Sequence, residues 1–91
     1  MKLFKVSQEE NHNYDTYDSF VVCTTDVERA RDMKPIYDDP NFSIVDWDDP
    51  KYQQKYNTSW ARTRNKVIVE YLGEARDGHP ETIICASFNA G

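Results

Sequence analysis

Four short segments rich in β-branched and aromatic residues are spread over the whole chain, and only one stretch shows helical spacing. Alternating or continuous apolar residues of this kind, bounded by turn formers, are typical of β-strands. The segments that predict strands are residues 2–8, 19–24, 66–72 and 82–88. A chain with four strands and one helix must bury one face of its sheet under that helix, which restricts it to a layered α+β fold.

The helix is predicted over residues 25–34. Apolar residues recur there at helical spacing, and Pro35 directly after the stretch ends it. Thr25 and Glu28 fit a capping box at its start. We therefore predict a small two-layer α+β domain with a mostly antiparallel four-stranded sheet, one main helix and an irregular insertion.

A chain of 91 residues is expected to form a single domain, residues 1–91. The last two predicted strands are separated by nine residues, 73–81, and are predicted to form a hairpin. Residues 35–60 are predicted to form the irregular insertion, with a short strand at 43–47 and a helical turn beginning at Asp49-Pro50. A sheet face or an edge strand left uncovered would favour a homodimer.

Acidic residues are concentrated in two segments. The chain has 16 acidic and 11 basic residues, and a net charge of −5. Residues 6–28 contain six acids and residues 35–50 contain five, with no Lys or Arg in either, so these segments sum to −11 and the rest to +6. Such a chain gains nothing from counterion release, so no direct nucleic-acid binding is expected. An acidic face can dock on a basic protein surface, although negative charge also simply favours solubility.

The sequence contains no recognisable catalytic or cofactor-binding motif. Its three glycines cannot form a phosphate-binding loop, and His12 and His79 lie in separate polar, turn-like segments. Cys23 and Cys85 lie in apolar runs without neighbouring ligands, so both are expected in the core and no metal site is predicted. No apolar stretch is long enough to span a membrane and no leader segment is recognisable, so we expect a cytoplasmic protein that is not an enzyme and needs no cofactor.

Aromatic residues are concentrated in the insertion. Six of the twelve lie between residues 37 and 60, interleaved with aspartates. Such side chains anchor protein interfaces, but they could equally pin the insertion to the domain. Packing is favoured for Trp60, and both interpretations remain open for Trp47. In the first acidic loop a Tyr-Asp pair repeats after three residues. This repeat predicts either a turn held by aspartate side chains or a recognition tip for a ligand. The predicted partner-binding residues are Tyr14, Asp15, Tyr17, Asp18, Asp46, Trp47, Asp48, Asp49 and Tyr52.

Five segments together resemble a known group of sequences: KLFKVSQ at 2–8, YDTYDS at 14–19, residues 25–31, YLGEA at 71–75 and CASFNAG at 85–91. The chain resembles a family of small bacteriophage and prophage proteins that has no assigned activity. The resemblance spans about two thirds of the chain and leaves out residues 35–60. It implies a phage protein that acts inside a bacterial host.

These observations predict a non-catalytic binding protein that blocks a host protein or protein complex, in the manner of an anti-defence or anti-CRISPR inhibitor. The alternative is a module that binds a small molecule or a nucleotide signal, with aromatic rings on the base and Arg62, Arg64 and Lys66 at the phosphate. A weaker third hypothesis is a phosphodiesterase that uses His12 and His79.

Overall fold

The computed structural model describes residues 1–10, 16–36, 42–50, 52 and 60–89. The main sheet is antiparallel and has four strands, which are β1 (Lys2–Gln8), β2 (Thr16–Thr24), β5 (Val67–Glu74) and β6 (Thr82–Asn89). A second, two-stranded sheet pairs β3 (Met33–Pro35) with β4 (Phe42–Ile44). The helical elements are α1 (Val27–Asp32) and the short 3-10 helix η1 (Arg64–Lys66). The predicted α+β class is confirmed.

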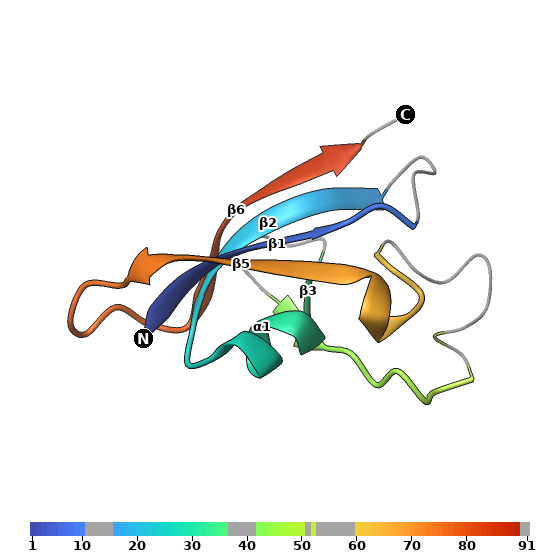
Figure 1. Ribbon diagram of the computed structural model, residues 1–91, viewed down its shortest axis with the longest axis horizontal. Helices are drawn as coiled ribbons and strands as arrows, with labels where there is room; N and C mark the ends of the chain where they lie inside the picture. Colours follow the sequence, from blue (N-terminus) through green and yellow to red (C-terminus); the bar gives the residue numbers. More distant parts are fainter. Residues whose placement is uncertain (11–15, 37–41, 51, 53–59, 90–91) are drawn as a thin grey trace.

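The strand order is β5-β1-β2-β6, so the predicted hairpin between the last two strands is wrong. β5 and β6 lie at opposite edges of the sheet, each beside one strand of the central β1–β2 pair (Figure 1). On β1, Val6 is opposite both Phe20 of β2 and Val69 of β5. On β2, Val21 is opposite Cys85 of β6. Apolar alternation predicts which face of a strand is buried, but it does not specify which strand lies alongside.

One face of the sheet forms the core. Phe4 and Val6 on β1 are buried on this face beside Val22 and Phe20, their partners on β2. α1 lies across this face and contacts β1, β2 and β5 (Figure 1). Trp60 is fully buried, and its ring lies 5.1 Å from that of Phe20, as the packing interpretation of Trp60 predicted. The core therefore depends on both the sheet and the end of the insertion.

The N-cap of the helix lies one residue later than the sequence predicted. Asp26 is its N-cap, with an extended backbone, and its Oδ1 accepts the backbone N–H of Arg29 at 2.9 Å. The predicted capping box of Thr25 and Glu28 is wrong, because Thr25 donates to the Asp26 carboxylate instead. The helix ends at Asp32 rather than at residue 34, because the chain from Met33 onward pairs with β4.

The two cysteines occupy different environments, and neither forms a disulfide. Cys23 is fully buried, with its Sγ 3.9 Å from the sulfur of Met1. Cys85 is exposed, so the expectation that it lies in the core is wrong. The reason is its place on β6, an edge strand, where it lies opposite Val21 on the face of the sheet away from α1.

Candidate functional site

The acidic turn, residues 46–49, directly follows β4 and Val45. Within it the Asp46 side chain accepts the backbone N–H of Asp48 at 3.1 Å, and the Asp46 carbonyl accepts that of Asp49 at 3.2 Å. An aspartate that bonds the backbone two residues ahead forms an Asx turn, which fixes the local conformation. Asp46 and Asp48 are exposed and Asp49 is half-buried. The turn thus presents two carboxylates from an ordered backbone.

The end of α1 holds this turn in place. The carbonyl oxygen of Asp32 accepts the backbone N–H of Val45 at 2.7 Å, and its Oδ1 accepts the indole N–H of Trp47 at 2.9 Å. The half-buried Trp47 also packs against the core. Its ring lies 5.4 Å from the ring of Tyr52 at 80°, and the Tyr52 hydroxyl donates to the carbonyl of Ala61. Both rings therefore help to fasten the insertion, as the packing interpretation predicted, and both remain partly exposed.

Three arginines on α1 and η1 are occupied by contacts within the chain. Arg64 pairs with Glu28 and Asp32, and hydrogen bonds to both carboxylates raise its pKa above the usual value. Arg29 pairs with Glu81, and this hydrogen bond raises the pKa of Arg29 and lowers that of Glu81. Arg31 donates to the carbonyl of Val67 at 2.7 Å. Their guanidinium groups are therefore already engaged in contacts within the chain.

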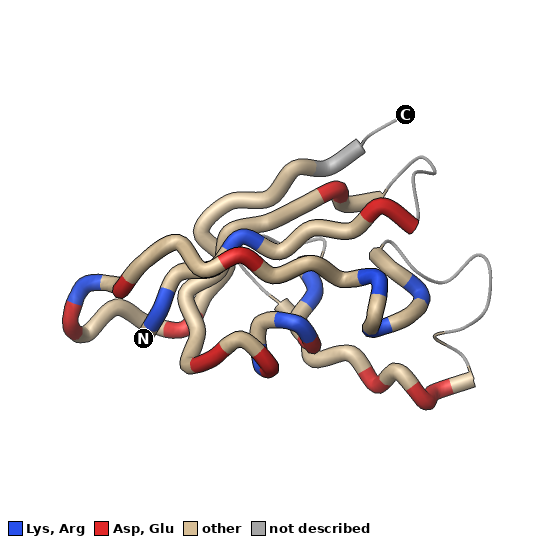
Figure 2. Tube along the Cα trace, in the orientation of Figure 1, with Lys and Arg blue, Asp and Glu red and all other residues tan. Residues whose placement is uncertain are grey.

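In the described part of the chain, no such cation pairs with the outer carboxylates of the acidic turn. Among the ion pairs between described residues, none involves Asp46 or Asp48. Figure 2 shows acidic and basic positions interleaved along α1, and acidic positions without basic ones along the described segment after β4. Because the nearby arginines already have partners, the charge that this surface offers to another molecule is mainly negative.

The predicted residues of the first acidic loop are only partly described. Tyr14 and Asp15 lie outside the described residues. Tyr17 lies in β2 with 8% of its surface exposed, and its hydroxyl donates to the carbonyl of Ile36 at 3.5 Å. Asp18, its neighbour on the same strand, is exposed. Of these residues, Asp18 offers an accessible charge and Tyr17 contributes to the core.

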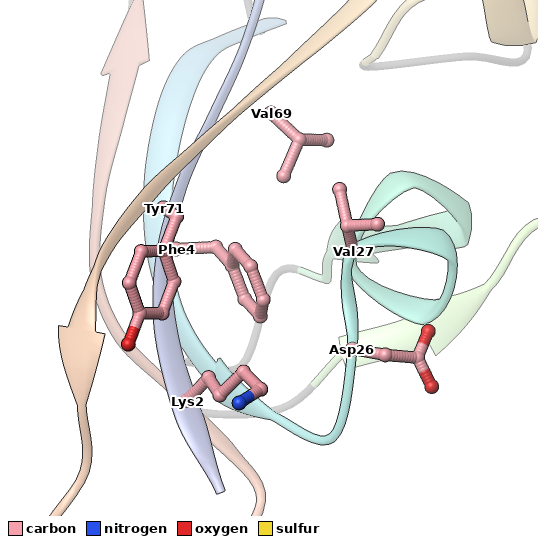
Figure 3. A pocket seen from close by; sticks show the side chains of 6 residues that line it. All are labelled: Lys2, Phe4, Asp26, Val27, Val69 and Tyr71. Atoms are coloured by element: carbon pink, nitrogen blue, oxygen red, sulfur yellow. The ribbon is translucent and has the colours of Figure 1, made fainter.

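A second feature, the recess, was not predicted from the sequence. It has a volume of about 570 Å³ and lies between β1, β5 and the start of α1, lined by Lys2, Phe4, Asp26, Val27, Val69 and Tyr71 (Figure 3). The rings of Phe4 and Tyr71 lie 5.8 Å apart. Tyr71 is 56% exposed and Val27 is 40% exposed, which leaves apolar surface facing water. The only sequence signal was the alternation of apolar residues on two strands whose pairing was unknown.

One cation lies at the end of the recess. The Lys2 ammonium is 5.9 Å from the centre of the Tyr71 ring and 3.3 Å from the Glu74 carboxylate. Hydrogen bonds from the Tyr71 hydroxyl, which has the larger effect, and from Lys2 hold the pKa of Glu74 below its usual value. The Lys2–Glu74 pair is largely exposed, so a ligand carboxylate could replace Glu74 at Lys2 with little loss of free energy.

The other predicted chemistry finds less support in the described residues. Arg64, proposed as a phosphate ligand, is engaged by two carboxylates. His79 Nδ1 lies 2.8 Å from the carbonyl of Pro80, and His12 falls outside the described residues. Across the described ranges, no group of three His, Cys, Asp or Glu side chains could hold a metal ion. Within those same ranges, no helix has the length and apolar character needed to cross a membrane.

Comparison with known proteins yields no significant match to a family model, to a characterised protein or to a solved structure. The fold and the two surface features therefore define the class of protein directly. It is a small α+β domain with an acidic, aromatic-flanked turn on one side and an apolar recess beside α1.

Proposed function

We propose that this protein is a non-catalytic binding protein that blocks a macromolecule of a bacterial host, and that its acidic turn docks on a basic surface of that target. The supporting observation is that Asp46 and Asp48 are exposed on a turn fixed by hydrogen bonds to Asp32, while the nearby arginines have partners within the chain. A turn that is already ordered loses little conformational entropy on binding. Opposite charges across an interface speed association and select the partner.

The rim of the acidic turn adds apolar contact. Trp47 and Tyr52 are both half-buried, so each keeps part of its ring accessible while its other side packs within the chain. Aromatic side chains beside charged groups are characteristic of interface anchors. The mechanism would be steric and electrostatic blockade, and a host protein whose basic surface normally holds nucleic acid is the type of target that suits it.

The setting follows from the resemblance to bacteriophage and prophage proteins. A phage protein of this kind would act in the cytoplasm of its bacterial host, as an anti-defence or anti-CRISPR-like inhibitor. Stoichiometric blockade needs no cofactor and no catalytic group, in keeping with a site built from carboxylates and aromatic rings.

The proposal is tested by capture of the target from nuclease-treated bacterial lysate, with quantitative mass spectrometry. The bait variants are Asp46→Lys/Asp48→Lys and a matched control, Glu70→Lys/Asp77→Lys, which reverses the same number of charges at exposed positions elsewhere. We expect a protein enriched by wild type and by the control to be lost with the acidic-turn variant. Equal recovery by all three baits, or loss with the control as well, would refute docking through the acidic turn.

The recess supports a second candidate function, the binding of a small apolar carboxylate. Phe4, Val69 and Tyr71 supply apolar and aromatic surface, and Lys2 supplies a cation at one end. A volume of about 570 Å³ is typical of small-molecule sites. The apolar body of the ligand would cover the exposed part of Tyr71, and its carboxylate would replace Glu74 at Lys2.

Phenylacetate, with phenylacetamide as its neutral counterpart, is a direct probe of this second function. We expect phenylacetate to cause saturable NMR shifts in the backbone amides of Phe4, Val27 and Tyr71. Phenylacetamide should bind with an affinity about fivefold lower. Lys2→Met should remove this preference and Lys66→Met, at an exposed lysine outside the recess, should retain it. Equal affinity for both probes, or no shifts at all, would exclude a carboxylate site.

A further inference from the structure

β6 is an edge strand without the charged residues or prolines that usually protect an edge. It ends the strand order, and no described strand pairs with its outer side (Figure 1). Its eight residues, TIICASFN, contain no charged side chain and no proline. The opposite edge, β5, carries Glu70 and Glu74. Because an edge strand exposes unpaired N–H and C=O groups, proteins usually place charges or prolines there to prevent pairing with another chain.

The middle of β6 is regular enough to pair. The register with β2 shifts between Val21 and Val22 and again between Tyr17 and Ser19, and such irregularities can protect an edge. Between these two shifts, however, Cys85, Ala86 and Ser87 follow β2 without interruption. Ile84, beside this stretch, is 45% exposed, and Cys85 is exposed as well. The three paired residues are therefore regular enough to accept another strand, and Ile84, which lies at the register shift, adds exposed apolar surface beside them.

We propose that β6 pairs antiparallel with β6 of a second copy of this chain, so that two four-stranded sheets join into one continuous sheet across a two-fold axis. An antiparallel pair of identical strands satisfies two-fold symmetry directly. Each copy carries a net charge of −5, so like-charged copies repel over much of their surface. The uncharged β6 is where this repulsion is smallest, whereas pairing through β5 would bring Glu70 and Glu74 of two copies together.

This pairing makes predictions that differ from those for the acidic turn. Because the two copies carry like charges, added salt should strengthen self-association. Binding of a basic partner through Asp46 and Asp48 should instead weaken as salt rises. The two proposals can therefore fail independently, and self-association can be measured on the purified chain alone.

Sedimentation equilibrium with a reducing agent present tests the dimer. We expect a species of twice the 10.7 kDa chain mass whose fraction rises with protein and salt concentration. Ile84→Lys on β6 should weaken dimerisation at least about tenfold, because it places a charge from each copy beside the otherwise uncharged pairing edge. The matched control is Ile68→Lys on β5, which is 53% exposed and should leave the dimer intact. Ser87→Lys is a second disrupting variant should Ile84→Lys misfold.

Four results would overturn the proposal. The first is a wild-type chain that stays monomeric at every concentration and salt. The second is a dimer that both folded β6 variants leave unchanged. The third is a dimer dissociated by Ile68→Lys, since that would place the interface at β5. Loss of the dimer on reduction would likewise contradict strand pairing and indicate a link through Cys85 instead.

Discussion

Replacing Trp47 with phenylalanine removes the indole N–H that joins the acidic turn to α1. This N–H donates to Asp32 Oδ1 at 2.9 Å, and a hydrogen bond to a charged acceptor contributes about 1.5–3 kcal/mol net. Trp47 is only half-buried, so the lower end of that range applies. The smaller ring also gives up some apolar contact with the core and Tyr52. Together these losses should reduce the free energy of unfolding by about 2 kcal/mol.

Urea denaturation monitored by circular dichroism measures this loss. Tyr71→Phe is the matched control, because it removes an exposed hydroxyl that donates to Glu74 and should leave the urea midpoint close to that of wild type. A double-mutant cycle of Trp47→Phe with Asp32→Ala should show coupling of about 1 kcal/mol, because each change removes one partner of the same hydrogen bond. If Trp47→Phe stays within about 0.5 kcal/mol of wild type, the indole does not hold the acidic turn and the reasoning fails.

Three further changes test other contacts. Glu81→Gln should lower stability at neutral pH by about 1 kcal/mol. Arg29 holds the pKa of Glu81 below its usual value, so the pair stabilises the fold fully above about pH 4.3, the pKa of an unfolded glutamate. This contribution is lost as pH falls through the lower folded pKa. Denaturation at a series of pH values should therefore show the stabilities of wild type and Glu81→Gln converge in acid. Gly78→Ala should cost about 1 kcal/mol in thermal unfolding through backbone strain alone, since Gly78 has φ +79° and an added Cβ meets nothing within 4 Å. Phe20→Ala should cost about 3–5 kcal/mol in urea denaturation, because Phe20 is buried against Trp60; a loss below about 1 kcal/mol would contradict the described core.

The elements of this fold were more predictable than their arrangement. β1 matches its predicted range, 2–8, because alternation with Phe4 and Val6 on one face is a local signal. The partners of β5 and β6 could not be predicted, because sheet pairing depends on contacts between distant residues. The helix start was misplaced by one residue because Thr25 and Asp26 are adjacent and both are good N-caps. Only the backbone conformation of Asp26 decides between them.

The candidate site was only partly predictable for a related reason. Local composition drew attention to Asp46, Asp48 and Trp47, and the structure places them on one ordered turn. Local composition could not show that Arg64 pairs with Glu28 and Asp32, because that pairing joins η1 to α1 across the fold. The recess was missed because Lys2 and Tyr71 meet only through the pairing of β1 with β5. The exposure of β6 was equally hidden until the strand order was known.

The most direct test of the central claim is the affinity of the captured host protein for this chain, measured by calorimetry over a series of salt concentrations. If the acidic turn docks on a basic surface, wild-type affinity should fall steadily as salt rises. The Asp46→Asn/Asp48→Asn variant should bind at least about tenfold more weakly at low salt and show a flatter salt dependence. Equal affinity and equal salt dependence of the two proteins would contradict the account.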